Sequence, residues 1–319
     1  MLVIVAPGQG AQVPGFLAPW LELSGMSELF EQWSSVVGID LKRYGVTADQ
    51  EEIRDTAVAQ PLLVSAGLAA ATALLGELDR VPESADVVAG HSVGEITAAS
   101  LAGVLSPEEA LLLIRERGLG MAEASAATST GMTAVLGGDR DEVLAAVEAA
   151  GLTAANDNGA GQLVVAGTRE QLDAFAAAPP ARARLRSLSV AGAFHTHHMA
   201  PAVDRVRTVA DTLSPTAPRT RLLSNRDGAE VASGSGCLDR IVTQISTPVR
   251  WDLCQETLIE LEATALIELP PAGTLTGLAK RTMPGVQRLA VKTPDDLPAA
   301  RELIKEHASQ PEADVKGRA

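Results

Sequence analysis

The most informative stretch of this 319-residue chain reads Ala85-Asp86-Val87-Val88-Ala89-Gly90-His91-Ser92-Val93-Gly94. Its first half is an apolar run that predicts a strand, and the helix-forming run 95–102 follows it. A strand, the motif Gly-x-Ser-x-Gly and a helix in this order are typical of a nucleophile elbow, a sharp turn that raises a serine hydroxyl above a sheet. The motif also occurs in ordinary glycine-rich turns, but its flanks favour the elbow. We therefore predict that Ser92 is a nucleophile and that the Val93 amide faces any oxyanion formed beside it.

The composition is that of a globular protein with an acidic balance. Hydrophobic residues make up 46% of the chain, and its formal net charge is −14. Because nucleic acids are bound by basic surfaces, we expect no nucleic-acid partner. We expect no apolar segment to span a bilayer, and so no membrane partner. The two cysteines give no disulfide framework and the chain opens on a strand-like run without a basic leader, so we expect a cytoplasmic protein.

The order of strand-like and helix-like runs predicts two subdomains. The runs alternate over the first 120 residues, which predicts a parallel α/β sheet. The order then becomes βαββαβ, that of a split ferredoxin-like unit, and we expect residues 125–192 to form it as an inserted small subdomain. Residues 1–124 and 193–306 are expected to form the large subdomain, and the polar residues 307–319 a disordered tail.

A serine hydroxyl becomes a nucleophile when a base takes its proton, and a histidine cluster offers the candidates. Three of the five histidines lie in the run His195-Thr196-His197-His198, where we expect the base. On a strand, His195 and His197 would face the same way with Asp204 nearby, so a metal site is an alternative for this cluster. Histidines solvated in a loop are the other alternative, above all for the last two.

Two further patterns bear on the chemistry of an acyl group. The glycine-rich loop 8–10 follows the first strand, where backbone amides point into the crevice at the end of a parallel sheet. The Gln9 amide is therefore a candidate second oxyanion donor, opposite that of Val93. A helix with a clear start at residue 106 carries Arg115 and Arg117, and the sequence alone does not say which of them turns inward.

Several ordered motifs run along residues 1–297, and together they are far more specific than any one alone. They are Pro7-Gly8-Gln9-Gly10-Ala11-Gln12, Gln60-Pro61, Gly90-His91-Ser92-Val93-Gly94-Glu95, Arg117-Gly118, Gly192-Ala193-Phe194-His195, Asn225, Pro248-Val249-Arg250-Trp251 and Leu275-Thr276-Gly277-Leu278. In this order they resemble the malonyl-CoA:acyl-carrier-protein transacylases, of the actinobacterial type. The resemblance implies a hydrolase-like parallel-sheet core with a ferredoxin-like insert, in agreement with the α/β fold predicted above.

The resemblance also implies roles for individual residues. Ser92 would be the acylated nucleophile, His195 the general base and acid, and Arg117 the residue that holds the malonyl carboxylate. The family has no acidic third member; a backbone carbonyl orients its histidine, and this carbonyl maps to Arg250.

Further residues of the site follow from the same resemblance. The amides of Gln9 and Val93 would form the oxyanion hole. Related enzymes that take methylmalonyl groups carry glutamine after the nucleophile and a small residue before the histidine, whereas this chain has the malonyl pattern, Val93 and Phe194. The other implied pocket residues are Met121, Met132 and Asn158.

The implied activity is a ping-pong transfer of the malonyl group from malonyl-CoA to the phosphopantetheine thiol of acyl carrier protein. It would supply extender units for fatty acid and polyketide synthesis, by a monomer without metal or other cofactor. A local basic patch would have to receive the acidic carrier, and its candidates are Lys280, Arg281, Arg182 and Arg184.

Two alternatives and one departure from the family remain at this point. A serine thioester hydrolase or esterase could use the same serine and histidine, and a non-catalytic module could dock carrier protein without chemistry. The departure is the turn at residues 270–273, which reads Pro-Pro-Ala-Gly where the family has Gly-Pro-Gly. Proline and alanine restrict φ where glycine does not, so the shape of this turn is not predicted.

Overall fold

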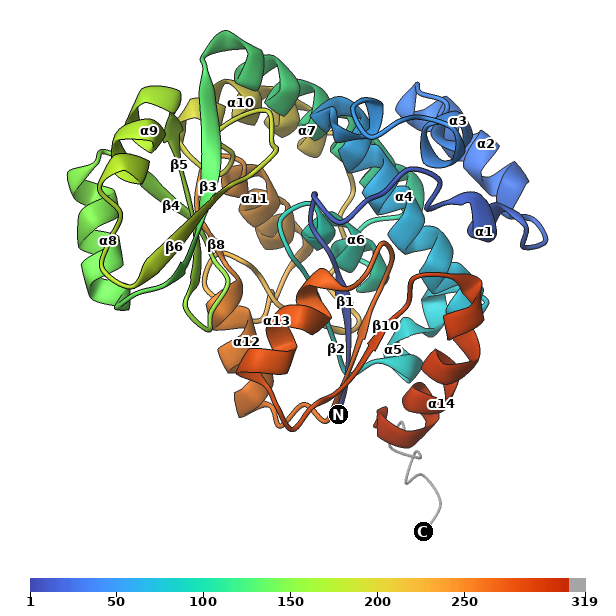
Figure 1. Ribbon diagram of the computed structural model, residues 1–319. Coiled ribbons are helices and arrows are strands. Elements are labelled where there is room, and N and C mark those ends of the chain that lie inside the picture. The colour runs from blue at the N-terminus through green and yellow to red at the C-terminus, as the bar shows by residue number, and fades with distance from the viewer. Residues whose placement is uncertain (310–319) are drawn as a thin grey trace.

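The computed structural model of the protein describes residues 1–309, and a five-stranded sheet, sheet A, lies at its centre (Figure 1). Its strands follow in the order β10 (Gln287–Ala290), β9 (Ala265–Glu268), β1 (Leu2–Ala6), β2 (Val87–Gly90) and β7 (Arg221–Leu222). Every neighbouring pair is parallel. The predicted parallel α/β sheet is therefore confirmed, and β2 ends at the first glycine of the elbow motif.

Helices cover both faces of sheet A because its strands are apolar on both sides. Along β1, Leu2 and Ile4 pack into one core and Val3 and Val5 into another, and all four are essentially unexposed. Since successive side chains of a strand point to opposite faces, each face needs its own cover. The first face is covered by α4 (Thr56–Leu75), α6 (Gly94–Leu101) and α7 (Pro107–Ala127), the second by α12 (Trp251–Glu260) and α13 (Thr274–Thr282).

Helix α4 corrects one expectation from the sequence. It has 20 residues and is long and apolar enough to cross a membrane, a length that no segment was expected to reach. In the fold, 89% of the most apolar 18-residue stretch of the helix is buried, and the helix packs against α6 and α7. The apolar length of α4 therefore serves the core of the protein.

A second sheet, sheet B, has the predicted βαββαβ order. Its elements are β3 (Thr130–Gly137), α8 (Arg140–Ala149), β4 (Thr153–Asp157), β5 (Gln162–Thr168), α9 (Arg169–Ala177) and β6 (Ala183–Ser187). These four strands pair antiparallel, and α8 and α9 cover one face around Val135, Val165 and Phe175. The opposite face of sheet B, which carries Ala134 and Val164, is turned to the rest of the molecule (Figure 1).

A fifth strand in sheet B was not expected from the sequence. β8 (Val249–Arg250) comes from the later part of the chain and pairs parallel with β4, with Val249 opposite Asn156 and Arg250 opposite Asp157. Two residues are too few to show a period-two pattern, which explains why the pattern did not reveal them. We propose the division into residues 1–124 with 193–306 and residues 125–192, with 249–250 completing sheet B.

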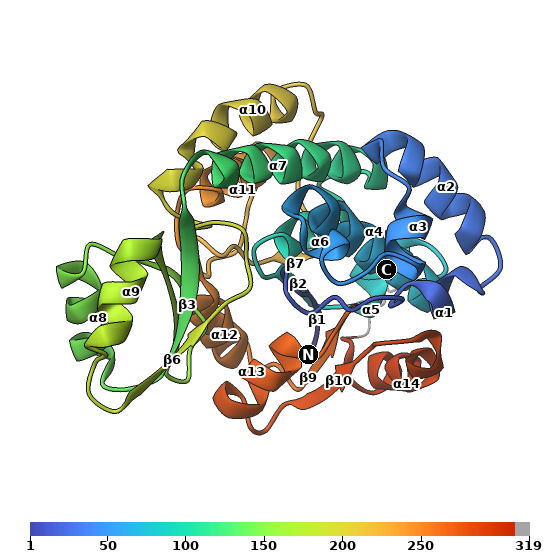
Figure 2. The same cartoon turned by 45° about the horizontal axis from the view of Figure 1, so that its top comes forward.

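Helix α7 leads from the first core into sheet B. Its start has the predicted capping box, in which Glu109 N donates to Ser106 Oγ at 3.1 Å and Ser106 N to a Glu109 carboxylate oxygen at 2.9 Å. The helix packs against α4 and against α10 (Ala200–Ala210), and β3 follows three residues after its end (Figure 2).

The remaining elements are mostly short and lie around these two sheets. They are α1 (Ala18–Leu21), α2 (Met26–Val37), α3 (Leu41–Val46), η1 (Glu52–Arg54), η2 (Leu78–Arg80), α5 (Val81–Ser84), η3 (His197–Met199), α11 (Gly234–Gln244), η4 (Pro294–Asp296) and α14 (Leu297–His307). The first residues of the tail expected from residue 307 belong to the described fold, because His307 ends α14 and Ser309 N donates to Asp86 Oδ1 at 3.2 Å. Residues 310–319 of that expected tail lie outside the described residues.

Candidate active site

Ser92 sits in a turn that only its two neighbouring glycines permit. Its φ is +54°, in the left-handed region that non-glycine residues rarely adopt. A Cβ on Gly90 would overlap the backbone of Gly94, and one on Gly94 would overlap the carbonyl of Ala6. The Ser92 amide donates to Asn225 Oδ1 at 2.7 Å, which fixes the turn from the side of β7. The strand, turn and helix thus have the geometry of the predicted elbow.

His195 lies within hydrogen-bond distance of the serine. The Ser92 Oγ and His195 Nε2 atoms are 2.8 Å apart, and His195 Nδ1 is 2.8 Å from the carbonyl oxygen of Gln244. Because a carbonyl can only accept, Nδ1 carries the hydrogen in the neutral ring and Nε2 is left to accept the serine proton. Burial, and next the charge of Arg117, lower the pKa of His195 to about 3, so the imidazole is neutral at physiological pH.

The carbonyl that orients His195 corrects a prediction: it belongs to Gln244, not to Arg250. Gln244 is the last residue of α11, where the helix leaves its carbonyls without intrahelical partners. Arg250 instead lies in β8; its amide donates to the carbonyl oxygen of Asn225 at 2.7 Å, and its guanidinium pairs with Asp252. Any residue offers a carbonyl, so the sequence holds no signal that distinguishes these two.

The arginine left open by the sequence is resolved by burial. Arg117 is 1% exposed, whereas Arg115 is on the surface of α7 beside Glu116. The Arg117 guanidinium donates to Gln60 Oε1 at 2.9 Å, to Gln244 Oε1 at 3.0 Å and to Ser92 Oγ at 3.3 Å. Its Nε has no acceptor among the described residues. Burial lowers the pKa of Arg117 to about 10, which leaves the group positively charged at neutral pH.

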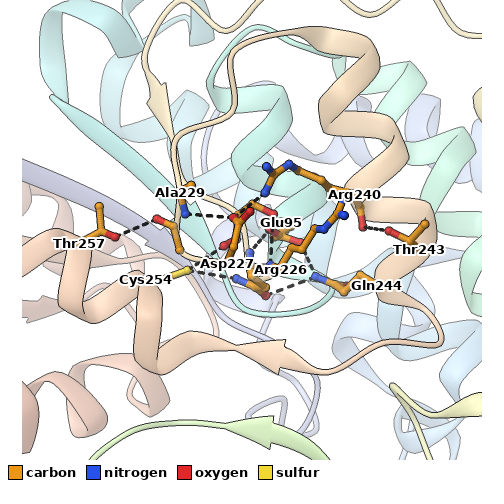
Figure 3. A network of polar contacts seen from close by, with 12 residues as sticks. Glu95, Arg226, Asp227, Ala229, Arg240, Thr243, Gln244, Cys254 and Thr257 are labelled. Carbon is orange, nitrogen blue, oxygen red and sulfur yellow. Dashed lines mark hydrogen bonds and ion pairs between the residues drawn. The ribbon is translucent and has the colours of Figure 1, made fainter.

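A buried carboxylate stands behind the serine and the arginine. Glu95, on α6, accepts a hydrogen bond from Asn225 N at 2.6 Å and a second from Gln244 Nε2. Figure 3 shows it together with Gln244 and with Arg240 of α11. Burial raises the pKa of Glu95 to about 7, against the backbone hydrogen bond of Asn225 and the charges of Arg117 and Arg240, which lower it.

Sequence reasoning assigned no role to Glu95, Gln244 or Asn225. A charged residue in the otherwise apolar run after the elbow was the available signal for Glu95. For the two amides the sequence offers little, because their partners are 149 and 133 positions away in the chain. Together the three residues hold the Ser92 amide, the Gln244 carbonyl that bonds to His195, and the Arg117 guanidinium in one buried network.

The two residues predicted to supply the oxyanion amides line the same cavity. Gln9 follows β1 and Val93 follows the serine, and both line a cavity of about 200 Å³ beside Ser92 and His195. Within residues 1–309, neither amide donates to a protein acceptor. Two free N–H groups near the reacting atoms are what an oxyanion requires, so the arrangement agrees with the predicted role.

The cavity brings together the predicted pocket residues. Phe194, Met121, Met132 and Asn158 all line it, along with Gln60 at the end near Arg117. Asn158 also faces His91, whose Nε2 lies 2.9 Å from its Oδ1. Arg182, Arg184 and Lys280 are exposed and lie outside this lining.

The comparisons with known proteins bear directly on this site. Residues 3–304 match the family model described as acyl transferase domain. The chain belongs to this family. It is 50% identical over 297 residues to the malonyl CoA-acyl carrier protein transacylase of Mycobacterium tuberculosis, which covers 93% of this chain and 98% of that protein. The Escherichia coli (strain K12) protein of the same name is 30% identical over 306 residues, 94% of this chain and 98% of that protein.

Solved structures of acyl transferases have the same fold. A crystal structure described as MCAT from Mycobacterium tuberculosis has a TM-score of 0.91 and 50% identity, over 94% of this chain and 99% of that one. A malonyl-transacylase in complex with a type II PKS acyl-carrier protein has a TM-score of 0.86 and 30% identity, over 95% and 99%. These likenesses confirm the predicted fold class and the resemblance stated from the motifs.

The structure does not support the alternative in which the histidine cluster binds a metal ion. His197 and His198 lie in η3 with their ring centres 4.1 Å apart, while His195 turns to Ser92. Over residues 1–309, no three His, Cys, Asp or Glu side chains are grouped as ligands of a metal ion.

The unusual turn at residues 270–273 is held by one buried carboxylate. Glu268, the last residue of β9, accepts hydrogen bonds from the amides of Gly273, Thr274, Leu275 and Thr276, at 2.8 to 3.1 Å. A negative charge at a helix start satisfies the free amides of α13. Since Thr274 lines the cavity, this contact positions α13 against the site.

Proposed function

We propose that the protein transfers the malonyl group from malonyl-CoA to the phosphopantetheine thiol of acyl carrier protein, through an ester on Ser92. The observation that carries the proposal is one buried cluster: Ser92 Oγ lies 2.8 Å from His195 Nε2 and 3.3 Å from the Arg117 guanidinium. A base and a fixed cation beside the same hydroxyl fit an acyl group that ends in a carboxylate.

In the first half-reaction the Ser92 oxygen attacks the thioester carbon while His195 Nε2 takes its proton. The oxyanion that forms is held by the Gln9 and Val93 amides. The carbon–sulfur bond then breaks, and His195 returns the proton to the sulfur of CoA, which leaves as a thiol. The second half-reaction runs the same way with the carrier thiol as nucleophile, and Ser92 recovers its proton as the leaving group.

Arg117 would receive the free carboxylate of the malonyl group. Its guanidinium already contacts the nucleophile, and the side-chain oxygens of Gln60 and Gln244 accept from its two terminal nitrogens. A carboxylate binds a guanidinium more strongly than an amide oxygen does, so the substrate can replace the Gln60 contact. This selects a dicarboxylic half-thioester over a simple acyl thioester, which has no carboxylate to replace the Gln60 contact on Arg117.

Val93 and Phe194 support malonyl over methylmalonyl as the group transferred. Both side chains line the cavity and both are nearly unexposed, so they limit the room beside the thioester. One additional methyl group changes binding by only about 1–3 kcal/mol in a pocket of this kind. We therefore expect a preference for malonyl-CoA with slow turnover of methylmalonyl-CoA.

The test is mass mapping of peptides after brief exposure to malonyl-CoA. The malonyl increment should fall on the peptide that contains Ser92, and acetyl-CoA should label this peptide poorly. Rapid release of free malonate without carrier protein would favour the thioester hydrolase instead. Full function in the Ser92→Ala variant would favour a docking module without chemistry. A label on any other residue would contradict the proposal.

The same proposal extends to the partner and the compartment. A relative solved with a type II PKS carrier supports polyketide as well as fatty acid synthesis as the process served. Cytoplasmic location is supported by Cys237 and Cys254, which are both free and buried. The carrier would dock at the basic residues near the end of α13 and β6: Lys280, Arg281, Arg182 and Arg184.

A further inference from the structure

A groove runs on from the cavity that holds Ser92. It has a volume of about 520 Å³ and shares five lining residues with the cavity, namely Gln9, Ala134, Gln162, Leu188 and Val190. Because these residues border both spaces, the groove and the cavity are continuous. A substrate with its acyl end at Ser92 can therefore lay its other end along the groove.

Three arginines line this groove, and they come from three different elements. Arg54 ends η1, Arg186 lies in β6, and Arg281 lies in the last turn of α13. Among residues 1–309, no Asp or Glu lines the groove, although the chain has 40 acidic residues and a net charge of −14. The groove is therefore a local positive site on an acidic protein.

The three guanidinium groups are available to a ligand. None of them forms an ion pair within the described residues 1–309. Arg281 donates to Gln162 Oε1 at 2.7 Å, which places it at the wall shared with the cavity. Arg186 stands opposite Ala134 in the sheet, and directly paired residues point to the same face, so it belongs to the face that borders the cavity.

We propose that this groove binds the phosphate of the phosphopantetheine arm. The proposal rests on the proposed function, in which malonyl-CoA and the loaded carrier both present that arm. Guanidinium groups match the geometry and charge of a phosphate ester. Malonyl-CoA and the phosphopantetheinylated carrier have the phosphate of this arm in common, so one site serves both half-reactions. From there the arm extends along the continuous space to Ser92.

The test compares three malonyl donors that differ only beyond the thioester arm: malonyl-CoA, malonyl-phosphopantetheine and malonyl-pantetheine. The variant Arg54→Gln/Arg186→Gln/Arg281→Gln is assayed for its rate of Ser92 loading. Hydrogen bonds between charged groups carry the binding here, so KM for the two phosphate-bearing donors should rise about tenfold or more. KM for malonyl-pantetheine should stay within about twofold, since it offers the groove no anion.

Arg169→Gln is the matched control. Arg169 is exposed and lines a neighbouring hollow that shares Arg54 and residues 187–190 with the groove, but it lies outside the groove itself. It removes one positive charge nearby and should leave KM for every donor unchanged. An equal rise in this control would assign the effect to general surface charge and overturn the proposal.

The remaining outcomes separate the sources of the phosphate. If KM rises for malonyl-CoA but not for malonyl-phosphopantetheine, the arginines bind the nucleotide part of CoA and the proposal is wrong. If KM for phosphopantetheinylated carrier protein is unchanged in the triple variant, the site does not serve the second half-reaction, which also overturns it. Failure of the proposed function is distinguishable, because Ser92 would then remain unlabelled with all three donors.

Discussion

The end of sheet A and the inner face of sheet B border one cavity, yet they contribute different things to it. The sheet A side supplies the elbow with Ser92, and the Arg117 guanidinium and the Gln244 carbonyl converge there. The inner face of sheet B presents Met132, Ala134, Asn156 and Val164, none of which is ionisable. The chemistry is therefore concentrated on one side, where buried hydrogen bonds fix each atom, and the shape of the cavity on the other.

The largest effect should come from removing the nucleophile on the sheet A side. Ser92→Ala leaves nothing to carry the acyl group, so the transfer rate should fall by about 10⁴-fold or more. Stopped assays with malonyl-CoA and carrier protein measure this. A variant that keeps even a tenth of the rate would place the covalent step elsewhere.

The next largest effect tests whether the guanidinium reads the substrate carboxylate. Arg117→Ala should lower kcat/KM for malonyl-CoA by about 10- to 100-fold, because a charged hydrogen-bond pair is lost. The same change should raise the rate with acetyl-CoA, which has no carboxylate. Arg115→Ala is the matched control, since this neighbour is on the surface of the same helix and should change neither rate. Equal losses with both substrates would indicate damage to the fold.

Glu95→Gln should have an intermediate effect and a distinct pH signature. The substituted amide offers one acceptor where the carboxylate receives hydrogen bonds from both Asn225 and Gln244, so the loading rate should fall about tenfold. With a pKa raised to about 7, Glu95 becomes charged above neutral pH, where it accepts more strongly from Asn225 N and Gln244 Nε2. These two residues hold the Ser92 amide and the His195 ring, so the charged form of Glu95 fixes the site more firmly.

The wild-type rate should therefore rise with pH through about 7, and this rise should be absent in Glu95→Gln. His195 does not supply the inflection, because with a pKa lowered to about 3 it stays neutral across that range. A rate profile from pH 5.5 to 8.5 measures the difference. An unchanged inflection in the variant would assign it to another group.

On the sheet B side, Met132→Ala should alter selectivity more than rate. The shorter side chain enlarges the cavity. The preference for malonyl-CoA over methylmalonyl-CoA should therefore weaken by about threefold, while kcat stays within about twofold. A thermal melt accompanies the assay, since removing buried methionine atoms lowers stability. A loss of kcat as large as that of Arg117→Ala would contradict the division between the two sides.

The smallest effect is expected for Arg250→Ala. The carbonyl that orients His195 belongs to Gln244, and the Arg250 side chain pairs with Asp252 of α12. Neither Arg250 nor Asp252 lines the cavity that holds Ser92, so the loading rate should stay within about twofold. A large loss would return Arg250 to the site.

The features that the sequence predicted correctly are those fixed by residues close together in the chain. The elbow and the start of α7 are local, because each is fixed by residues within a few positions of one another. The period of apolar residues likewise predicted the alternation of strands and helices over the first 120 residues and the βαββαβ order of β3 to β6. These features depend on steric and hydrogen-bonding rules that operate along the chain.

What the sequence missed depends on contacts between distant residues. A backbone carbonyl has no side-chain identity, so the sequence did not correct the assignment to Arg250, and only the placement of α11 next to His195 identifies Gln244. Arg115 and Arg117 lie on different faces of α7, and the packing of α4 against α7 covers the face that carries Arg117. The pairing of Glu95 with Gln244 and Asn225 likewise forms only when β7 and α11 meet α6.

The two-residue strand β8 has a consequence for anyone who builds chimeras of this enzyme. A graft of residues 125–192 into a relative would carry β4 without the neighbour that pairs with Asn156 and Asp157. An unpaired strand edge invites pairing with other molecules, so such hybrids should aggregate unless the recipient supplies a matching segment. Exchanging residues 249–250 together with the insert would keep that edge closed.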